Sequence, residues 1–96
     1  MAKKVLVVED DSNIAELLRL YLEKDGFDVF LAADGGEGIR RAQELQPDLI
    51  LLDIMLPGLS GLEVCKQLKR NPNTKDIPII FLTAKAEEID KVLGLE

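Results

Sequence analysis

The chain has 96 residues, of which 47% are hydrophobic and 31% are charged, and it carries a net charge of −6 at pH 7. This length allows one domain but not two, and the composition is ordinary for a globular protein. The acidic balance and the absence of a basic cluster argue against a nucleic-acid surface, and no apolar run approaches the roughly 20 residues that span a bilayer.

The first predicted elements are a strand and a helix. Residues 5–8 are apolar without interruption, which is typical of a parallel strand covered by helices on both faces. The apolar residues between 14 and 22 follow helical spacing and predict the first helix. Asp11 is a candidate cap for this helix, and Asn13 with Glu16 has the spacing of a capping box.

A second strand is predicted over residues 27–31, and a second helix begins at Asp34 with Glu37 as its capping partner. Residues 49–52 form another apolar run, which ends at Asp53. We interpret this run as a third strand that is buried on both faces.

A third helix follows, and its predicted buried side consists of Leu62, Cys65 and Leu68. The sequence Asn-Pro-Asn at residues 71–73 ends this helix, and residues 79–82 predict a fourth apolar strand. Residues 86–95 could start a fourth helix. The alternation predicts an α/β domain with a parallel sheet that has helices on both faces.

Polar side chains follow three of the predicted strands at the point where each strand ends, and these are Glu9, Asp10, Asp53 and Thr83. The carboxyl ends of parallel strands meet at one edge of a sheet, so these residues should become neighbours. Three converging carboxylates repel one another unless a cation joins them. Oxygen ligands without histidine or cysteine favour a hard ion, and Mg²⁺ is the predicted cofactor.

An aspartate beside such an ion can attack phosphorus and form an acyl phosphate. Asp53 is the candidate nucleophile because it lies between an apolar strand and a Pro-Gly loop. The Thr83 hydroxyl could donate a hydrogen bond to one of the transferring oxygens, whose charge the ion would neutralise.

Three motifs carry a resemblance to a known family. Residues 7–11 (Val-Val-Glu-Asp-Asp), 53–58 (Asp-Ile-Met-Leu-Pro-Gly) and 82–85 (Leu-Thr-Ala-Lys) resemble the signatures of the response-regulator receiver domains of bacterial two-component systems. The Leu-Pro-Gly variant is similar to regulators that carry a winged-helix DNA-binding domain. The resemblance extends over residues 1–96 and identifies them as one receiver domain.

The resemblance implies a flavodoxin-like, doubly wound sheet with the strand order 2-1-3-4. It also implies that Asp53 is the phosphoacceptor, that Asp10 is a direct metal ligand and that Glu9 holds the metal through water. The Met55 carbonyl would be the third protein ligand, and Thr83 would be the switch hydroxyl. A histidine kinase would be the phosphoryl donor, so the chain would be a phosphoacceptor and not an enzyme in the usual sense.

Receiver domains of this family continue through a fifth strand and a fifth helix, which also supply a lysine and the switch aromatic residue. From their absence we expect retained metal binding, weak or absent phosphorylation and lost switching. The fourth strand would then be an apolar sheet edge consisting of Ile79, Ile80, Phe81 and Leu82. Such edges template pairing with other chains, so we expect self-association or docking through this strand.

Two other classes of function are compatible with the residues. One is a Mg²⁺-dependent phosphohydrolase with Asp53 as nucleophile, which would need a general acid and a substrate cap. The other is a structural fragment of the flavodoxin-like fold, suited to folding, domain swapping or assembly. The single cysteine, Cys65, excludes an internal disulfide, and the N-terminus lacks a signal-peptide pattern, so the compartment predicted is the cytoplasm.

Overall fold

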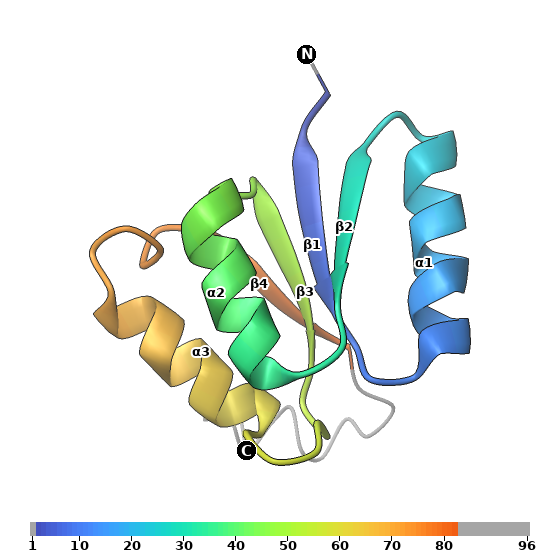
Figure 1. Ribbon diagram of the computed structural model, residues 1–96. Coiled ribbons are helices and arrows are strands. Elements are labelled where there is room, and N and C mark those ends of the chain that lie inside the picture. The colour runs from blue at the N-terminus through green and yellow to red at the C-terminus, as the bar shows by residue number, and fades with distance from the viewer. Residues whose placement is uncertain (1, 83–96) are drawn as a thin grey trace, which may run out of the picture.

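The structure is a computed structural model that describes residues 2–82 (Figure 1). Thr83 and the predicted start of a fourth helix at residue 86 lie outside the described residues. In chain order the elements are β1 (Lys4–Val8), α1 (Ser12–Lys24), β2 (Asp28–Ala32), α2 (Gly35–Leu45), β3 (Leu49–Asp53), α3 (Gly61–Arg70) and β4 (Ile79–Leu82).

The four strands form one parallel sheet in the order β2-β1-β3-β4. The predicted α/β class and the strand order 2-1-3-4 are therefore confirmed. Figure 1 shows α1 on one side of the sheet and α2 and α3 on the other. No helix among residues 2–82 is long and apolar enough to cross a bilayer.

The core has two layers, one on each face of the sheet. Leu6, Val8, Ile50 and Leu52 are completely buried and pack with residues of α2 and α3. Val5 and Val7 are buried on the opposite face, where Leu18 and Leu22 of α1 pack against them. Burial on both faces explains why residues 5–8 of β1 and residues 49–52 of β3 are all apolar.

The helix caps differ in part from the prediction. Asp34 accepts a hydrogen bond from Glu37 N at 2.8 Å, which confirms Asp34 as the cap of α2, while the Glu37 side chain accepts from Ala33 N at 2.9 Å and not from the Asp34 amide of a complete capping box. The box predicted from Asn13 and Glu16 is wrong.

Asp11 is the cap of α1, because its backbone is extended and its Oδ1 accepts hydrogen bonds from Asn13 N and Ile14 N at 2.9 and 3.2 Å. Asn13 already lies inside the helix, and the Glu16 carboxylate pairs with Arg19 instead.

The buried side of α3 also differs. Val64 and Leu68 are completely buried, four residues apart, whereas Leu62 and Cys65 are only half-buried on the flanks of this stripe. The helix therefore faces the sheet with a stripe rotated from the predicted one. Cys65 packs against the core, and its burial raises the pKa of the thiol, which fits a structural residue.

Candidate functional site

The pairing of β1 with β3 brings the acidic residues together. Val8 is in register with Leu52, so the residues that follow them, Glu9 and Asp53, meet at the carboxyl edge of the sheet. One carboxylate oxygen from each of Glu9, Asp10 and Asp53 lies within 4.8 Å of the others. The convergence predicted from the sequence is thus present in the fold.

Glu9 is the buried member of this acidic cluster, with only 6% of its surface exposed. Its Oε2 accepts a hydrogen bond from Asp11 N at 3.0 Å. Burial raises the pKa of Glu9, and the charges of Asp53 and Asp10 raise it further, while the bond from Asp11 opposes the shift. Among residues 2–82, the charged groups that shift the pKa of Glu9 are the acidic Asp53 and Asp10, so ionisation of Glu9 is unfavourable there.

Asp53 is the last residue of β3 and is half-buried. Its Oδ1 accepts a hydrogen bond from Met55 N at 3.1 Å, which fixes the orientation of the carboxylate. Met55 lies in the loop between β3 and α3, and its side chain is 67% exposed. Its backbone is thus tied to Asp53 although its side chain has no place in the core.

The chemistry of this cluster fits Mg²⁺. Its donors are three carboxylates, two of them on neighbouring residues of one loop and the third on the adjacent strand. Carboxylate oxygens with room for retained water are the usual environment of this ion. Asp10 is exposed, so water can reach the site from solvent.

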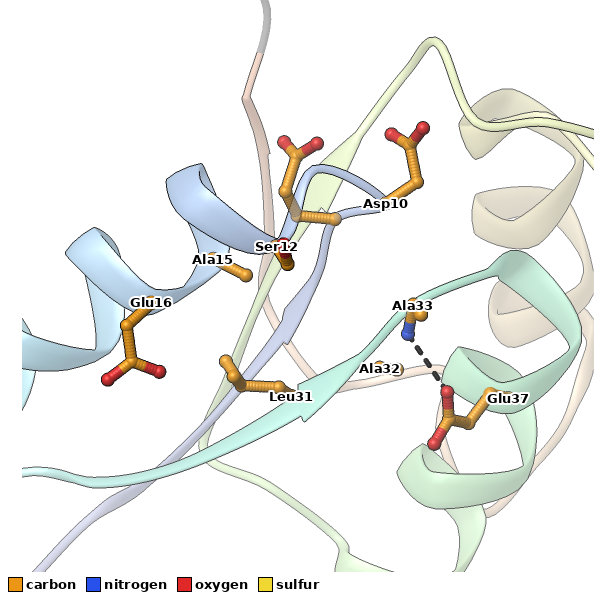
Figure 2. Close-up of a pocket in the computed structure, with 9 residues that line it drawn as sticks. Asp10, Ser12, Ala15, Glu16, Leu31, Ala32, Ala33 and Glu37 are labelled. Carbon is orange, nitrogen blue, oxygen red and sulfur yellow. Dashed lines mark hydrogen bonds between the residues drawn. The ribbon is translucent and has the colours of Figure 1, made fainter.

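A cavity of about 280 Å³ lies beside the cluster, between the start of α1 and the segment that follows β2. Figure 2 shows the residues that line it, among them Asp10 and Glu16, together with the hydrogen bond from Ala33 to Glu37. Its apolar lining includes Ala15, Leu31 and Ala32. The cavity provides space for water next to Glu9 and Asp10.

The sequence analysis missed two features of this site. The Asp11 amide holds Glu9, and a backbone donor has no signature in the residue types. The cavity was also missed, because its only signal in the sequence is the pair of small residues Ala32 and Ala33, and two neighbouring alanines do not indicate a cavity. Thr83 falls outside the described residues, so its place is not part of this geometry.

Added Mg²⁺ should stabilise the fold most at neutral pH. The pKa of Glu9 is raised in the folded chain, so the folded state gains stability relative to the unfolded state as Glu9 takes up a proton on acidification. The ion requires ionised carboxylates, and its stabilisation should therefore shrink as the pH falls through the raised pKa. At a concentration 100 times its Kd, an ion stabilises by about 2.7 kcal/mol.

Thermal unfolding with and without Mg²⁺, measured over a series of pH values, checks this expectation. In Glu9→Gln the increment from Mg²⁺ should be smaller and should depend less on pH. If the stabilisation by Mg²⁺ grew on acidification, Mg²⁺ binding would not depend on an ionised Glu9 and the expectation would be contradicted.

Comparison with known proteins agrees with the fold and the acidic cluster. Residues 5–96 match the family described as the response regulator receiver domain. The chain is 54% identical, over all 96 residues, to the alkaline phosphatase synthesis transcriptional regulatory protein PhoP of Bacillus subtilis. It spans only 39% of the length of that relative.

Two solved structures show the same architecture. The N-terminal domain of a response regulator receiver protein from Methanoculleus marisnigri superposes with a TM-score of 0.90 at 34% identity, covering 98% of this chain and 78% of that one. The receiver domain of a sensor histidine kinase from Pseudomonas aeruginosa superposes with a TM-score of 0.89 at 32% identity, covering 100% and 80%. That second structure has a magnesium ion coordinated in its active-site cleft.

The parallel sheet, the acidic cluster at its carboxyl edge and the family match over residues 5–96 lead to one assignment. The chain belongs to the response regulator receiver domain family.

Proposed function

We propose that this chain is the phosphoacceptor module of a two-component system, which receives a phosphoryl group on Asp53 from a histidine kinase in the presence of Mg²⁺. The observation that carries the proposal is the convergence of carboxylate oxygens from Glu9, Asp10 and Asp53 within 4.8 Å. Such a cluster is unfavourable without a cation, and one of its members is the last residue of the central strand β3.

In this proposal Asp10 and Asp53 ligate the ion directly, and Glu9 holds it through a water molecule. The Met55 carbonyl is the third protein ligand, consistent with the hydrogen bond that ties Met55 N to Asp53. When bound, Mg²⁺ neutralises the charge that develops on the transferring oxygens. Thr83 would donate its hydroxyl to one of these oxygens.

The transfer itself forms a bond between a carboxylate oxygen of Asp53 and phosphorus. The bond between phosphorus and the histidine nitrogen of the donor breaks, and the imidazole leaves with the electron pair. Met55 N holds the Asp53 carboxylate in a fixed orientation for this attack. The weakened phosphorylation expected from the resemblance stays a prediction.

Titration with Mg²⁺ followed by beryllofluoride, a mimic of the phosphoryl group, tests this function. Amide chemical shifts around Asp53 should respond to Mg²⁺ alone and then again, with saturation, to beryllofluoride. A chain that responds to neither ligand would support the structural-fragment alternative. Steady turnover of a phosphate ester would favour the phosphohydrolase.

The edge of the sheet supports a proposal about self-association. Among residues 2–82, β4 pairs only with β3, and Ile80 in β4 is 53% exposed. An apolar strand with a free edge templates pairing with another strand. We propose that two copies of this chain associate through β4.

Substitution of Ile80 by lysine should weaken this association at least about tenfold, because a charge on an edge strand opposes pairing. Leu20→Lys is the matched control, since Leu20 on α1 is also 53% exposed but lies away from β4. Light scattering over a range of concentrations gives the oligomeric state. A wild-type chain that stays a monodisperse monomer at high concentration would refute the proposal.

A further inference from the structure

Gly61, the first residue of α3, lies directly against the backbone of Asp53. A Cβ at this position would overlap the Asp53 carbonyl oxygen and lie 2.7 Å from the Cα of Ile54 and 2.9 Å from the carbonyl carbon of Asp53. These are backbone atoms, which cannot rotate aside as the end of a flexible side chain can. Because the glycines with positive φ are Gly26 and Gly58, Gly61 is required for space and not for its backbone conformation.

A second contact joins the same two segments. Gly61 N donates a hydrogen bond to the carbonyl oxygen of Ile54 at 2.9 Å. The start of α3 is therefore held to the backbone after Asp53 by close packing against the Asp53–Ile54 peptide and by a hydrogen bond to the next peptide, Ile54–Met55. The Asp53 side chain branches from the Cα that precedes this peptide, and its Oδ1 accepts from Met55 N just beyond it.

Other glycines provide a contrast. A Cβ on Gly35 would meet Val64 Cγ2 at 2.7 Å and Leu59 O at 2.8 Å, so this position is also crowded, but its nearest atoms belong to Leu59 and Val64 and not to Asp53 or Ile54. A Cβ on Gly36 would have only ordinary contact, with Asp34 Oδ1 at 3.5 Å.

We propose that Gly61 is a positioning residue for the Asp53 carboxylate: by allowing α3 to touch the Asp53–Ile54 peptide, it holds that carboxylate in the acidic cluster. A side chain at position 61 displaces this peptide or the start of α3, and the Asp53 carboxylate turns away from Glu9 and Asp10. The inference deepens the proposed function and rests on it for the metal, but the position of the carboxylate can be measured without one.

The test compares Gly61→Ala with Gly35→Ala and Gly36→Ala. In the absence of metal, hydrogen exchange at the Met55 amide reports the bond to Asp53 Oδ1. Gly61→Ala should speed this exchange at least about tenfold relative to wild type and should raise the Kd for Mg²⁺ at least about tenfold, since small misplacements of reacting groups have effects of this size.

Gly35→Ala should lose thermal stability but keep the Mg²⁺ affinity and the Met55 exchange rate within about threefold of wild type. Gly36→Ala should keep the wild-type Mg²⁺ affinity and Met55 exchange, and its thermal stability should be equal or higher because alanine favours a helix more than glycine does. Unchanged Met55 exchange in a folded Gly61→Ala would overturn the inference. So would an equal loss of Mg²⁺ affinity in Gly35→Ala, because general loosening would then explain both.

If Gly61→Ala does not fold, hydrogen exchange in the wild-type chain tests the positioning role of Gly61 instead. The Gly61 amide, bonded to Ile54 O, should be protected from exchange, and Mg²⁺ should increase the protection at least about threefold if α3 and Asp53 are coupled. Mg²⁺ binding that leaves Gly61 exchange unchanged would contradict the inference. A wild-type chain that binds no Mg²⁺ refutes the proposed function instead, and the Met55 exchange in Gly61→Ala then decides the positioning role alone.

Discussion

Asp53→Asn should abolish the response to beryllofluoride completely, because the amide is not a nucleophile or an anionic ligand for the phosphoryl mimic. The affinity for Mg²⁺ should fall at least about tenfold, since the ion loses one of the three carboxylates that lie within 4.8 Å of one another. Isothermal titration with Mg²⁺ and amide chemical shifts with beryllofluoride measure the two effects.

The same substitution should raise the thermal stability of the metal-free chain. The charge of Asp53 is one cause of the raised pKa of Glu9, so its removal relieves a repulsion inside the folded state. Two unit charges about 4 Å apart repel by about 1 kcal/mol even in water, which sets a lower bound for this partly buried pair. For a domain of this size that corresponds to a rise of about 4–8 °C in Tm.

Asp28→Asn is the matched control for this variant. Asp28 is exposed at the first position of β2, and it pairs with Lys4 at the opposite edge of the sheet from the acidic cluster. The Asp28→Asn substitution makes the same chemical change at a position away from Glu9 and Asp10. Equal losses of Mg²⁺ affinity in both variants would mean that net charge, and not the site, controls binding.

Leu52→Ala should have the largest effect on folding. Leu52 is completely buried in β3, where it is in register with Val8 on one side and Phe81 on the other. It belongs to the core cluster that also contains Val64 and Leu68 of α3. Truncation of a buried leucine leaves a cavity and costs about 2–5 kcal/mol.

A loss of that size is a large part of the roughly 5–15 kcal/mol by which domains are stable, so Leu52→Ala should be partly unfolded or close to it. Urea denaturation gives the free energies of unfolding of the wild-type chain and of Leu52→Ala. Leu20→Ala makes the same change at a position on α1 that is 53% exposed and should alter stability by no more than about 0.5 kcal/mol. Similar losses in the two variants would show that Leu52 is not a core residue.

The relation between Leu52 and Asp53 shows how the fold positions the site. Leu52 is anchored in the core and Asp53, the next residue, carries the carboxylate to the edge of the sheet. On β1 the completely buried Val8 precedes Glu9 in the same way. The site is therefore built on the ends of the two inner, buried strands of the sheet, which limits the freedom of its side chains.

The strands and the acidic cluster could be predicted from the sequence because both depend on simple rules. Uninterrupted apolar runs indicate strands buried on both faces, and the carboxyl ends of parallel strands share one edge. These rules are sufficient to place Glu9, Asp10 and Asp53 together from the sequence alone. Asp34 as the cap of α2 was predictable from local sequence, because its side chain and the Glu37 amide have the spacing of a cap and its bonded donor.

Local rules failed where two residues competed for one role. Asp11 and Asn13 both have side chains that cap helices, and the choice between them depends on which residue keeps an extended backbone after β1. The burial of Val64 in place of Leu62 and Cys65 likewise depends on the direction in which α3 faces the sheet. Helical spacing permits more than one such direction.

The sequence by itself therefore determined the order of the elements, the layers of the domain and the identity of the acidic residues, because each follows from the period of apolar residues along the chain. Only the tertiary structure decided that Glu9 is buried against the Asp11 amide and that Gly61 touches the Asp53 backbone. In each contact one partner is a backbone group, the Asp11 amide or the Asp53 backbone, which has no signature in the residue type, so the contact is set by how α1 and α3 approach the ends of the strands.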